Sequence, residues 1–378
     1  MIDFSKIPSP SYVIDEVLLR KNLELIKDIS KRVGVEILLA LKGFAMWKAF
    51  PVIREYINGA AVSSVNEAKL ANEEMHCKTH TYAPVYQPDS FNEVIKYSSH
   101  ITFNSIKQFK KFLPEIKKSK NNISVGLRIN PEYSAVESGL YNPCSPGSRL
   151  GILAENMPKE LPNEIEGLHI HNLCESDSFA LEKTLQAIED KFGKYFNMIK
   201  WINLGGGHLM TKKGYNVMHL ISILKSFQEK YKFEIILEPG AAFVWETGYL
   251  VSTILDIVEN KKTHTAILDV SFTAHMPDCL EMPYKPEIIG AMDEVIGKPT
   301  YRIGGSSCLA GDYTGNWSFD KKLEIGQKII FKDMIHYTMV KTSMFNGVNH
   351  PSIGMWTKDN KFELFREFGY EDYKNRLC

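Results

Sequence analysis

The sequence predicts an α/β protein: a (β/α)8, TIM-like barrel followed by a mostly β domain. From about residue 12 to residue 245, short apolar runs alternate with amphipathic, Lys/Glu-rich segments, which is typical of strand and helix in turn. Eight of the apolar runs have the length and composition of strands. Eight strands joined by helical crossovers favour a closed barrel, whose chemistry lies on the loops at the carboxyl ends of the strands.

The barrel strands are expected at Glu36–Ala40, Gly59–Val62, Thr79–Tyr82, Ile101–Phe103, Ser124–Ile129, Gly167–Ile170, Trp201–Leu204 and Glu234–Leu237. After residue 245 the strand-like runs follow one another without long helical patterns between them, at Tyr249–Val258, Thr265–Leu268, Thr300–Ile303 and Gln327–Phe331. We therefore expect a barrel domain over residues 12–245 and a β-barrel-like domain over 246–378, which residues 1–11 join.

Composition favours small-molecule chemistry. The 45 basic and 45 acidic residues cancel, and no long block of either sign predicts binding to nucleic acid or to a membrane surface. The first residues contain acids and prolines where a signal peptide needs a basic and then an apolar segment, and no apolar stretch is long enough to cross a bilayer. We therefore expect a cytoplasmic protein.

The six cysteines are widely spaced, without a CxxC pair or a Cys/His group at metal-binding spacing. Neither a disulfide framework nor a metal site is expected. Each cysteine taken alone is better explained as a buried, inert thiol, since free Cys packs as a small apolar side chain.

Lys42 directly follows the run Glu-Ile-Leu-Leu-Ala-Leu, at the end of the first expected strand. A lysine in this position is usually a solvated cap. The alternative is a lysine that forms a Schiff base, partly desolvated so that its amine is neutral and attacks an aldehyde. Other sites have to decide between the two readings.

Two further motifs follow neighbouring strands. Gly205, Gly206 and Gly207 come after Trp201–Leu204, and their backbone N–H groups could surround a phosphate, although a tight turn explains the triplet equally well. The sequence Glu238-Pro239-Gly240 comes after the next strand; its carboxylate could be an exposed loop acid or could bind a protonated ring nitrogen.

Histidine follows another barrel strand in Gly167-Leu-His-Ile-His171-Asn. A lone histidine here is more often a hydrogen-bonded core residue. His169 and His171 share strand parity, so at least one of them could point into the mouth of the barrel.

The combined motifs resemble the pyridoxal 5′-phosphate (PLP) enzymes with an alanine-racemase-like fold (fold type III), especially their decarboxylase branch. The resemblance covers nearly the whole chain. Its motifs are, in order, Pro8-Ser9-Pro10-Ser11-Tyr12-Val13, Ala40-Leu41-Lys42, Leu127-Arg128-Ile129-Asn130-Pro131, Ser148-Arg149-Leu150-Gly151, Leu204-Gly205-Gly206-Gly207, Glu238-Pro239-Gly240, Gly304-Gly305-Ser306-Ser307-Cys308, Tyr337-Thr338 and Phe345-Asn346-Gly347.

The resemblance implies a cofactor site. Lys42 would form the Schiff base with PLP, His171 would stack on its ring, and Glu238 would keep the ring nitrogen protonated, which favours decarboxylation. The phosphate would be held by a wider set: Gly205, Gly206, Gly207, Gly240 and Tyr337.

The resemblance also implies a homodimer with shared active sites, to which the β domain of each copy contributes. Cys308 would return a proton to the α-carbon in the partner's site, and Asp312 would bind the distal amine of the substrate. Arg149 is expected to bind substrate as well. The family's racemases instead use a tyrosine base and an arginine opposite the ring nitrogen, so Cys308 and Glu238 argue against racemisation.

Departures from the common family pattern indicate the substrate. Glu-Pro-Gly is usually followed by Arg, but here by Ala241-Ala242, which puts recognition of a second carboxylate in doubt. The usual His-Val-Gly-Ser is replaced by His171-Asn-Leu-Cys-Glu175. Both features, and the short chain, resemble carboxynorspermidine/carboxyspermidine decarboxylases, whose products are norspermidine and spermidine.

A long cationic substrate needs acids along a groove, and Asp278, Glu281 and Asp312 are the candidates, although any one of them is more often a solvated loop residue. The nearest alternative is a diaminopimelate or an ornithine/lysine decarboxylase. A non-catalytic PLP-binding protein is a weaker alternative, because such proteins resemble the barrel alone.

Overall fold

The computed structural model describes residues 2–378 and divides the chain into two compact units. The barrel unit is Asn22–Phe243; the β unit combines the segment up to Lys21 with Val244–Cys378. The division differs from the expected 12–245 at the amino-terminal side. There, strand β1 (Ser11–Asp15) pairs with strands of the β unit, so residues 12–21 belong to that unit.

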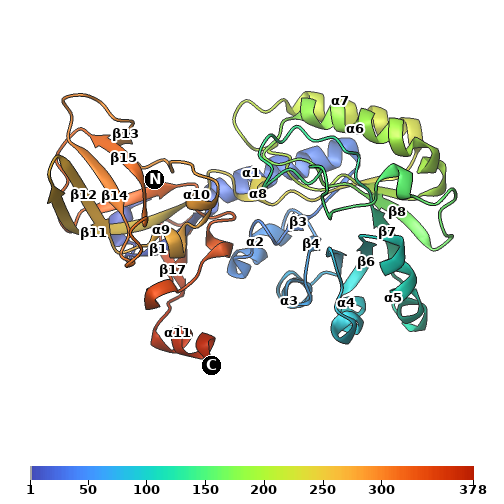
Figure 1. Cartoon of the computed structure of the whole chain (residues 1–378), viewed down its shortest axis with the longest axis horizontal. Coiled ribbons are helices and arrows are strands. Elements are labelled where there is room, and N and C mark those ends of the chain that lie inside the picture. Colours follow the sequence, from blue (N-terminus) through green and yellow to red (C-terminus); the bar gives the residue numbers. More distant parts are fainter. Residues whose placement is uncertain (1) are drawn as a thin grey trace. The chain divides into compact units, whose positions relative to one another are not determined.

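The expected barrel is confirmed as a ring of parallel strands. All eight expected strands are present (Figure 1). They are β2 (Glu36–Ile37) with β3 (Leu39–Ala40), β4 (Ala60–Val62), β5 (Thr79–Tyr82), β6 (Ser98–Phe103), β7 (Ser124–Arg128), β8 (Ile165–His169), β9 (Trp201–Asn203) and β10 (Glu234–Leu237).

The first strand is divided at Leu38, and this division closes the ring. β2 pairs with β10, whereas β3 pairs with β4. The Leu38 N–H donates to the Leu237 carbonyl at 2.9 Å, and the next N–H, of Leu39, donates to Gly59 on the opposite side at 3.1 Å. One continuous apolar run therefore joins the last strand of the barrel to the second.

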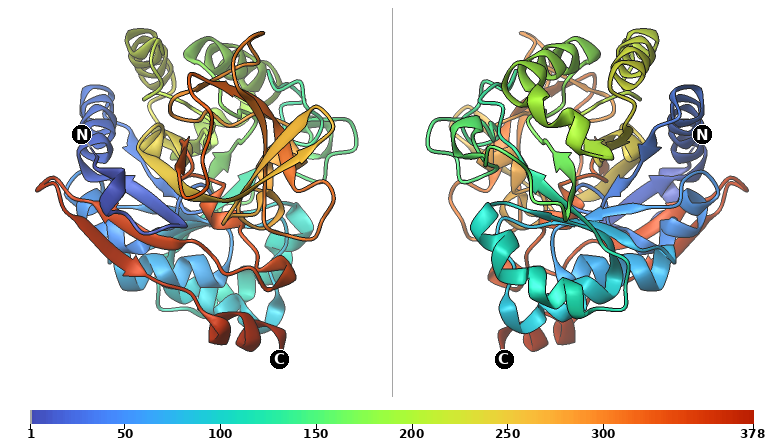
Figure 2. Two further views of the ribbon diagram at one scale, coloured as in Figure 1. Left: turned by 90° about the vertical axis from the view of Figure 1, so that its left-hand side faces the viewer. Right: turned by 90° about the vertical axis from the view of Figure 1, so that its right-hand side faces the viewer.

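Helices surround the barrel strands (Figure 2). Those of the barrel unit are α1 (Glu16–Val33, which begins in the β unit), α2 (Phe50–Arg54), α3 (Val65–Leu70), α4 (Phe91–Tyr97), α5 (Ile106–Lys118), α6 (Ser178–Phe192), α7 (Val217–Tyr231) and α8 (Ala241–Val244). Short helical turns are η1 (Phe4–Lys6), η2 (Trp47–Ala49), η3 (Ala71–Met75), η4 (Pro88–Ser90), η5 (Ala154–Asn156), η6 (Gly193–Met198), η7 (Met339–Lys341) and η8 (Phe345–Gly347). Within residues 2–378, no helix combines the length and apolarity that spanning a bilayer would require.

The connection from β7 to β8 departs from the ideal barrel. It contains the bridge between Ile129 and Ile152 and the single turn η5, but no long helix. Asn104, which follows β6, binds this connection twice: its Nδ2 donates to the Arg149 carbonyl (2.8 Å) and its Oδ1 accepts from the Gly151 N–H (2.8 Å). The Asn104 side chain thus holds the β7–β8 connection in place, whereas the other connections between barrel strands contain an α-helix.

Two histidines pack inside the barrel on neighbouring strands. The rings of His80 (β5) and His100 (β6) stack with centroids 3.8 Å apart. Burial lowers the pKa of His100 to about 4 and that of His80 well below its usual value. Both rings are therefore neutral at pH 7.

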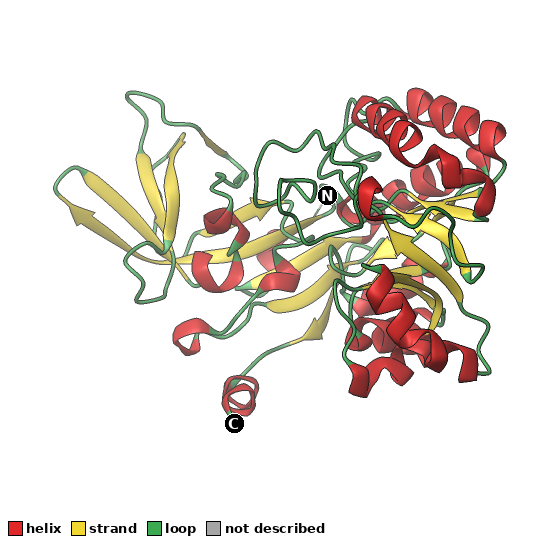
Figure 3. Ribbon diagram, turned by 45° about the vertical axis from the view of Figure 1, so that its right-hand side comes forward, coloured by secondary structure: helices red, strands yellow, loops and turns green. Residues whose placement is uncertain are grey.

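The β unit is built around a second, mixed sheet (Figure 3). Its strand order is β13-β15-β14-β12-β11-β1-β17-β18, and β16 pairs with β11. The strands are β1, β11 (Gly248–Asn260), β12 (Thr263–Leu268), β13 (Ala291–Met292), β14 (Thr300–Gly304), β15 (Tyr313–Phe319), β16 (Lys328–Lys332), β17 (Ser352–Trp356) and β18 (Phe362–Arg366), and the helices are α9 (Phe272–His275), α10 (Asp278–Glu281) and α11 (Tyr370–Leu377). The four strands expected from sequence are β11, β12, β14 and β16.

Candidate active site

Lys42 lies just beyond β3, at the carboxyl end of the barrel strands. Its side chain keeps contact with solvent, yet the surrounding protein lowers the pKa of its amine, first by desolvation and then by the nearby Arg128 cation. The charges of Cys174, Glu238 and Glu67 act in the opposite direction. A larger fraction of the amine is therefore neutral than in a free lysine.

Backbone contacts bring Lys42 beside the Glu238-Pro239-Gly240 loop. The Ala40 N–H donates to the Pro239 carbonyl at 3.1 Å. A Cβ atom on Gly43 would lie 2.9 Å from the Gly240 Cα, a distance that real Cβ atoms do not adopt. Glycine at position 43 is therefore what permits the loops after β3 and β10 to meet.

Glu238 is a largely buried carboxylate, with its side chain 12% exposed, between Asn203 and His169. Its Oε1 accepts a hydrogen bond from Asn203 Nδ2 at 2.6 Å, and its Oε2 lies 3.5 Å from His169 Nε2. Burial raises the pKa of Glu238 to about 7, against the lowering effects of the Asn203 bond and of the Lys42 and Arg128 cations. A cationic ligand would favour the ionised form.

The glycine triplet packs against Glu238 and His171. The Gly205 N–H donates to Asn203 Oδ1 (2.8 Å) and the Gly206 N–H to His171 Nδ1 (3.0 Å). A Cβ on Gly206 would overlap the Glu238 carbonyl oxygen. The triplet is therefore a close backbone junction between the loops after β8, β9 and β10, which are adjacent strands.

His171 follows β8 and is neutral in this site. Burial lowers its pKa well below the usual value, and the Lys42 and Arg128 cations act in the same direction. Because Nδ1 accepts the Gly206 N–H, the ring proton belongs on Nε2.

Arg128 is a site residue that sequence reasoning did not select, although it lies in a quoted motif. Its side chain is 4% exposed, its Nη2 donates to the His171 carbonyl (3.0 Å), and its guanidinium lies 4.6 Å from the centre of the Tyr82 ring. Among residues 2–378 it has no ion pair with a carboxylate. The available signal was a charged residue at the end of an apolar strand, as at Lys42.

Arg149 is exposed, and its carbonyl is held by Asn104 as described above. Its charge acts on the Tyr82 hydroxyl, as does that of Arg128. Tyr82 also donates to Asn104 Oδ1 at 2.8 Å. Tyr82 therefore lies within the electrostatic influence of both Arg149 and the buried Arg128.

In the β unit, Cys308 is exposed and its N–H donates to Asn346 Oδ1 at 2.9 Å. Asp312 departs from the expected contact with substrate. It is 4% exposed, and its carboxylate accepts four hydrogen bonds: from the N–H and hydroxyl of Ser307 (3.0 and 2.7 Å), the Thr273 N–H (2.9 Å) and the Ser271 hydroxyl (3.2 Å). These bonds fix the turn that carries Cys308.

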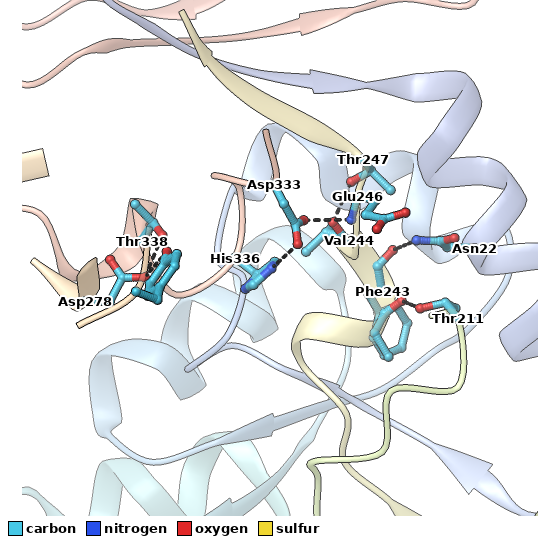
Figure 4. A network of polar contacts seen from close by, with 12 residues as sticks. Asn22, Thr211, Phe243, Val244, Glu246, Thr247, Asp278, Asp333, His336 and Thr338 are labelled. Atoms are coloured by element: carbon cyan, nitrogen blue, oxygen red, sulfur yellow. Dashed lines mark hydrogen bonds and ion pairs between the residues drawn. The ribbon is translucent and has the colours of Figure 1, made fainter. Parts of the chain in front are cut away.

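The other two expected substrate acids also have partners in the β unit. Asp278 Oδ2 accepts from Thr338 Oγ1 at 2.9 Å (Figure 4) and from the Tyr284 hydroxyl at 3.1 Å. Glu281 pairs with Lys341. Asp278 Oδ1 has no hydrogen-bond partner among residues 2–378. Thr338 follows Tyr337, whose φ is 45°, so Asp278 helps to hold the Tyr337 turn.

A second contact fixes this turn from its other side. Asp333 accepts from the Glu246 N–H at 2.6 Å and lies 3.1 Å from His336 Nε2 (Figure 4). Tyr337 is thus preceded and followed by residues with defined partners.

The barrel residues fit a phosphorylated aldehyde that carries a basic ring. They provide an amine of lowered pKa, a largely buried carboxylate, a guanidinium without a carboxylate partner among the described residues, and a glycine junction where a Cβ atom would not fit. Of the expected residues, Lys42, His171, Gly205, Gly206, Gly207, Glu238 and Gly240 are brought together in the barrel unit. Cys308, Asp312, Tyr337, Asp278 and Glu281 belong to the β unit.

Comparisons with known proteins agree with this chemistry. The family model described as "Pyridoxal-dependent decarboxylase, C-terminal sheet domain" matches residues 11–335. A carboxyaminopropylagmatine decarboxylase of Synechocystis sp. is 51% identical over 99% of this chain and 96% of its own length. A carboxynorspermidine/carboxyspermidine decarboxylase of Campylobacter jejuni is 45% identical over 99% of both chains.

A solved structure is similar over the same extent. The crystal structure of carboxynorspermidine decarboxylase from Campylobacter jejuni, complexed with norspermidine, superposes with a TM-score of 0.91 and 43% identity. It covers 98% of this chain and 100% of that chain.

Proposed function

This chain belongs to the pyridoxal-dependent decarboxylases, and we propose that it removes carbon dioxide from carboxynorspermidine or carboxyspermidine, with PLP as cofactor and norspermidine or spermidine as product. The observation that carries the proposal is the convergence of Lys42, Glu238 and Arg128 at one end of the barrel, in a chain this similar to decarboxylases of carboxylated polyamines.

PLP, when bound, supplies a cationic ring that accepts the electron pair left by the departing carbon dioxide. Lys42 would hold the cofactor through its aldehyde, Glu238 would pair with its ring nitrogen, and His171 would bind its ring. Arg128 binds an anionic oxygen of the ligand, which would give its guanidinium the missing partner. The phosphate is received by Gly205, Gly206, Gly207, Gly240 and Tyr337.

In the homodimer that the family resemblance implies, Cys308 reaches the partner's site and its thiol gives a proton to the carbon that has lost carbon dioxide. Its exposed position in the β unit is consistent with this role. Asp312, with all its hydrogen bonds inside the unit, acts through the turn of Cys308 rather than on substrate.

The cationic tail of the substrate meets Asp278 and Glu281. Asp278 retains a carboxylate oxygen without a hydrogen-bond partner among the described residues, and Glu281 lies on the same short helix, α10. Arg149, whose charge acts on the Tyr82 hydroxyl, is the remaining residue that we assign to substrate binding.

A second candidate substrate is carboxyaminopropylagmatine, because the relative from Synechocystis sp. that carries this name is 51% identical to the chain. The two kinds of substrate share the amino-acid head and differ at the far end of the tail. Agmatine ends in a planar guanidinium, which binds carboxylates in a bidentate manner, whereas norspermidine ends in an ammonium.

The test is carbon dioxide release by purified, PLP-loaded protein. Carboxynorspermidine, carboxyspermidine, carboxyaminopropylagmatine, meso-diaminopimelate, ornithine and lysine are compared side by side. We expect kcat/KM for a carboxylated polyamine to exceed that for the short amino acids by about 10–100-fold or more. Lys42→Ala is the control and should release no carbon dioxide.

Preference for diaminopimelate or ornithine would support the proposed decarboxylation but would contradict the proposed substrate. Preference for carboxyaminopropylagmatine would assign the second candidate. PLP binding without carbon dioxide release from any compound would favour a non-catalytic binding protein. A cytoplasmic location stays a prediction from the amino-terminal sequence.

A further inference from the structure

His169 is a buried histidine of the barrel that the proposed chemistry does not yet use. It ends β8, is 2% exposed, and its ring contacts the Tyr82 ring edge-on with centroids 5.2 Å apart. Neither ring nitrogen has a hydrogen-bond partner among the described residues. Such an atom is unusual in a protein interior, because a buried polar group without a hydrogen-bond partner is destabilising.

The nearest polar atom recorded for this ring is the outer oxygen of Glu238. His169 Nε2 lies 3.5 Å from Glu238 Oε2, while Oε1 is already fixed by Asn203. Asn203 in turn accepts from the Gly205 N–H. Asn203 thus donates to one oxygen of the Glu238 carboxylate, and the His169 ring lies close to the other.

We propose that His169 is a positioning residue for Glu238: its Nε2–H donates to Oε2 and holds the carboxylate ionised and aimed at the ring nitrogen of bound PLP. The inference rests on the proposed cofactor. A neutral histidine suits this role, because a cationic one would compete with the ring nitrogen for the carboxylate charge.

The charges around the pair agree with a neutral donor. Burial and the Arg128 and Lys42 cations lower the pKa of His169 well below its usual value. The same two cations, with Glu36 acting in the opposite direction, act on Glu238. The other titratable neighbours of His169 are the neutral rings of His80 and His171 and the Tyr82 phenol, whose pKa burial raises. Nothing in this group supplies Oε2 with a donor other than His169.

Two substitutions separate the hydrogen bond from the packing. His169→Phe keeps an aromatic ring against Tyr82 and loses the N–H, whereas His169→Gln loses the ring and places an amide N–H near the position of Nε2. The Kd of PLP is measured on the purified apo-proteins, and kcat is measured against pH.

We expect His169→Phe to weaken PLP binding by about 10–100-fold and to move the acidic limb of the kcat profile to higher pH, because Glu238 is then harder to ionise. His169→Gln should stay within about threefold of wild type. Equal effects of the two substitutions, or an unchanged Kd in His169→Phe, would overturn the proposal.

A double-mutant cycle covers the case in which His169→Phe merely disturbs folding. In a Glu238→Gln background, His169→Phe should have little further effect on the Kd of PLP. An equal loss in both backgrounds would assign His169 a packing role only. The Kd requires no turnover, so a wild-type protein without decarboxylase activity would overturn the proposed function and leave this test intact.

Discussion

Asp312 was expected to bind substrate, and its hydrogen bonds instead favour a role in holding the turn of Cys308. Its carboxylate accepts hydrogen bonds from Ser307, Thr273 and Ser271, the last two about forty positions earlier in the chain. It is 4% exposed. A buried carboxylate with this many donors is expected to contribute to stability, and the contact with Ser307 joins it directly to Cys308.

We predict that Asp312→Asn lowers the thermal stability of the protein, by about 1–3 kcal/mol, because an amide presents a donor where a second donor already points. Turnover should fall through kcat, with KM for the polyamine nearly unchanged. The exposed Asp359→Asn is the matched control and should stay within about 0.5 kcal/mol. Unchanged stability together with a raised KM would restore the role in substrate binding.

The residues that sequence reasoning found and missed differ in a physical respect. Lys42 and Glu238 follow apolar strands directly, where the barrel fold itself predicts function. Arg128 and His169 end such strands, and from sequence alone a polar residue there is equally well explained by solvent. The structure distinguishes a site residue from a solvated one by its contacts. Both side chains contact Tyr82, and His169 also lies near Glu238.

At the level of elements, the barrel strands were predictable because each is an apolar run between amphipathic helices. The division of the first strand at Leu38 was not, since nothing interrupts the apolar run there. In the β unit, β15 and β17 each contain a glycine, and β13 has only two residues, so no sustained strand pattern marks them. β1 was assigned to the wrong unit because its partners, β11 and β17, lie far along the chain.

The buried histidines of strands β5 and β6 predict that the folded protein loses stability at acidic pH. The folded pKa of His100 is about 4, whereas an unfolded histidine has a pKa near 6.5, so between these values only the unfolded chain takes up the proton. Stability is therefore fully present above about pH 6.5 and falls as the pH drops toward 4. Glu36, whose pKa burial raises, acts in the opposite direction.

The measurement is the thermal midpoint of the apo-protein between pH 7.5 and 4.5. His100→Gln should reduce the slope, by an amount on the order of 1–3 kcal/mol over this range. His264→Gln, at a position whose side chain is 44% exposed, is the control and should keep the wild-type slope. A wild-type slope in His100→Gln would contradict the assignment.

At the scale of the whole molecule, the proposed homodimer makes a quantitative prediction. Lys42 lies in the barrel unit and Cys308 in the β unit, and we expect one site to combine the Lys42 of one subunit with the Cys308 of its partner. Lys42→Ala and Cys308→Ala should each be inactive alone. After mixing under conditions that allow subunit exchange, half of the dimers are mixed, and each then has one intact site.

Activity should therefore recover to about a quarter of the wild-type value. Sedimentation of the wild-type protein gives the subunit number independently. Absence of recovery, with exchange shown by a tagged subunit, would mean that Lys42 and Cys308 act within the same chain.

The divided first strand links the completion of the barrel to its chemistry. β2 and β3 close the ring through β10 and β4, and Lys42 lies four residues beyond the division at Leu38. Its neighbours Ala40 and Gly43 contact Pro239 and Gly240 of the loop after β10. The amine meets Glu238 only when the two ends of the sheet have joined. Formation of the Schiff base at Lys42 therefore depends on closure of the barrel, and a chain whose barrel had not closed would not react with the aldehyde.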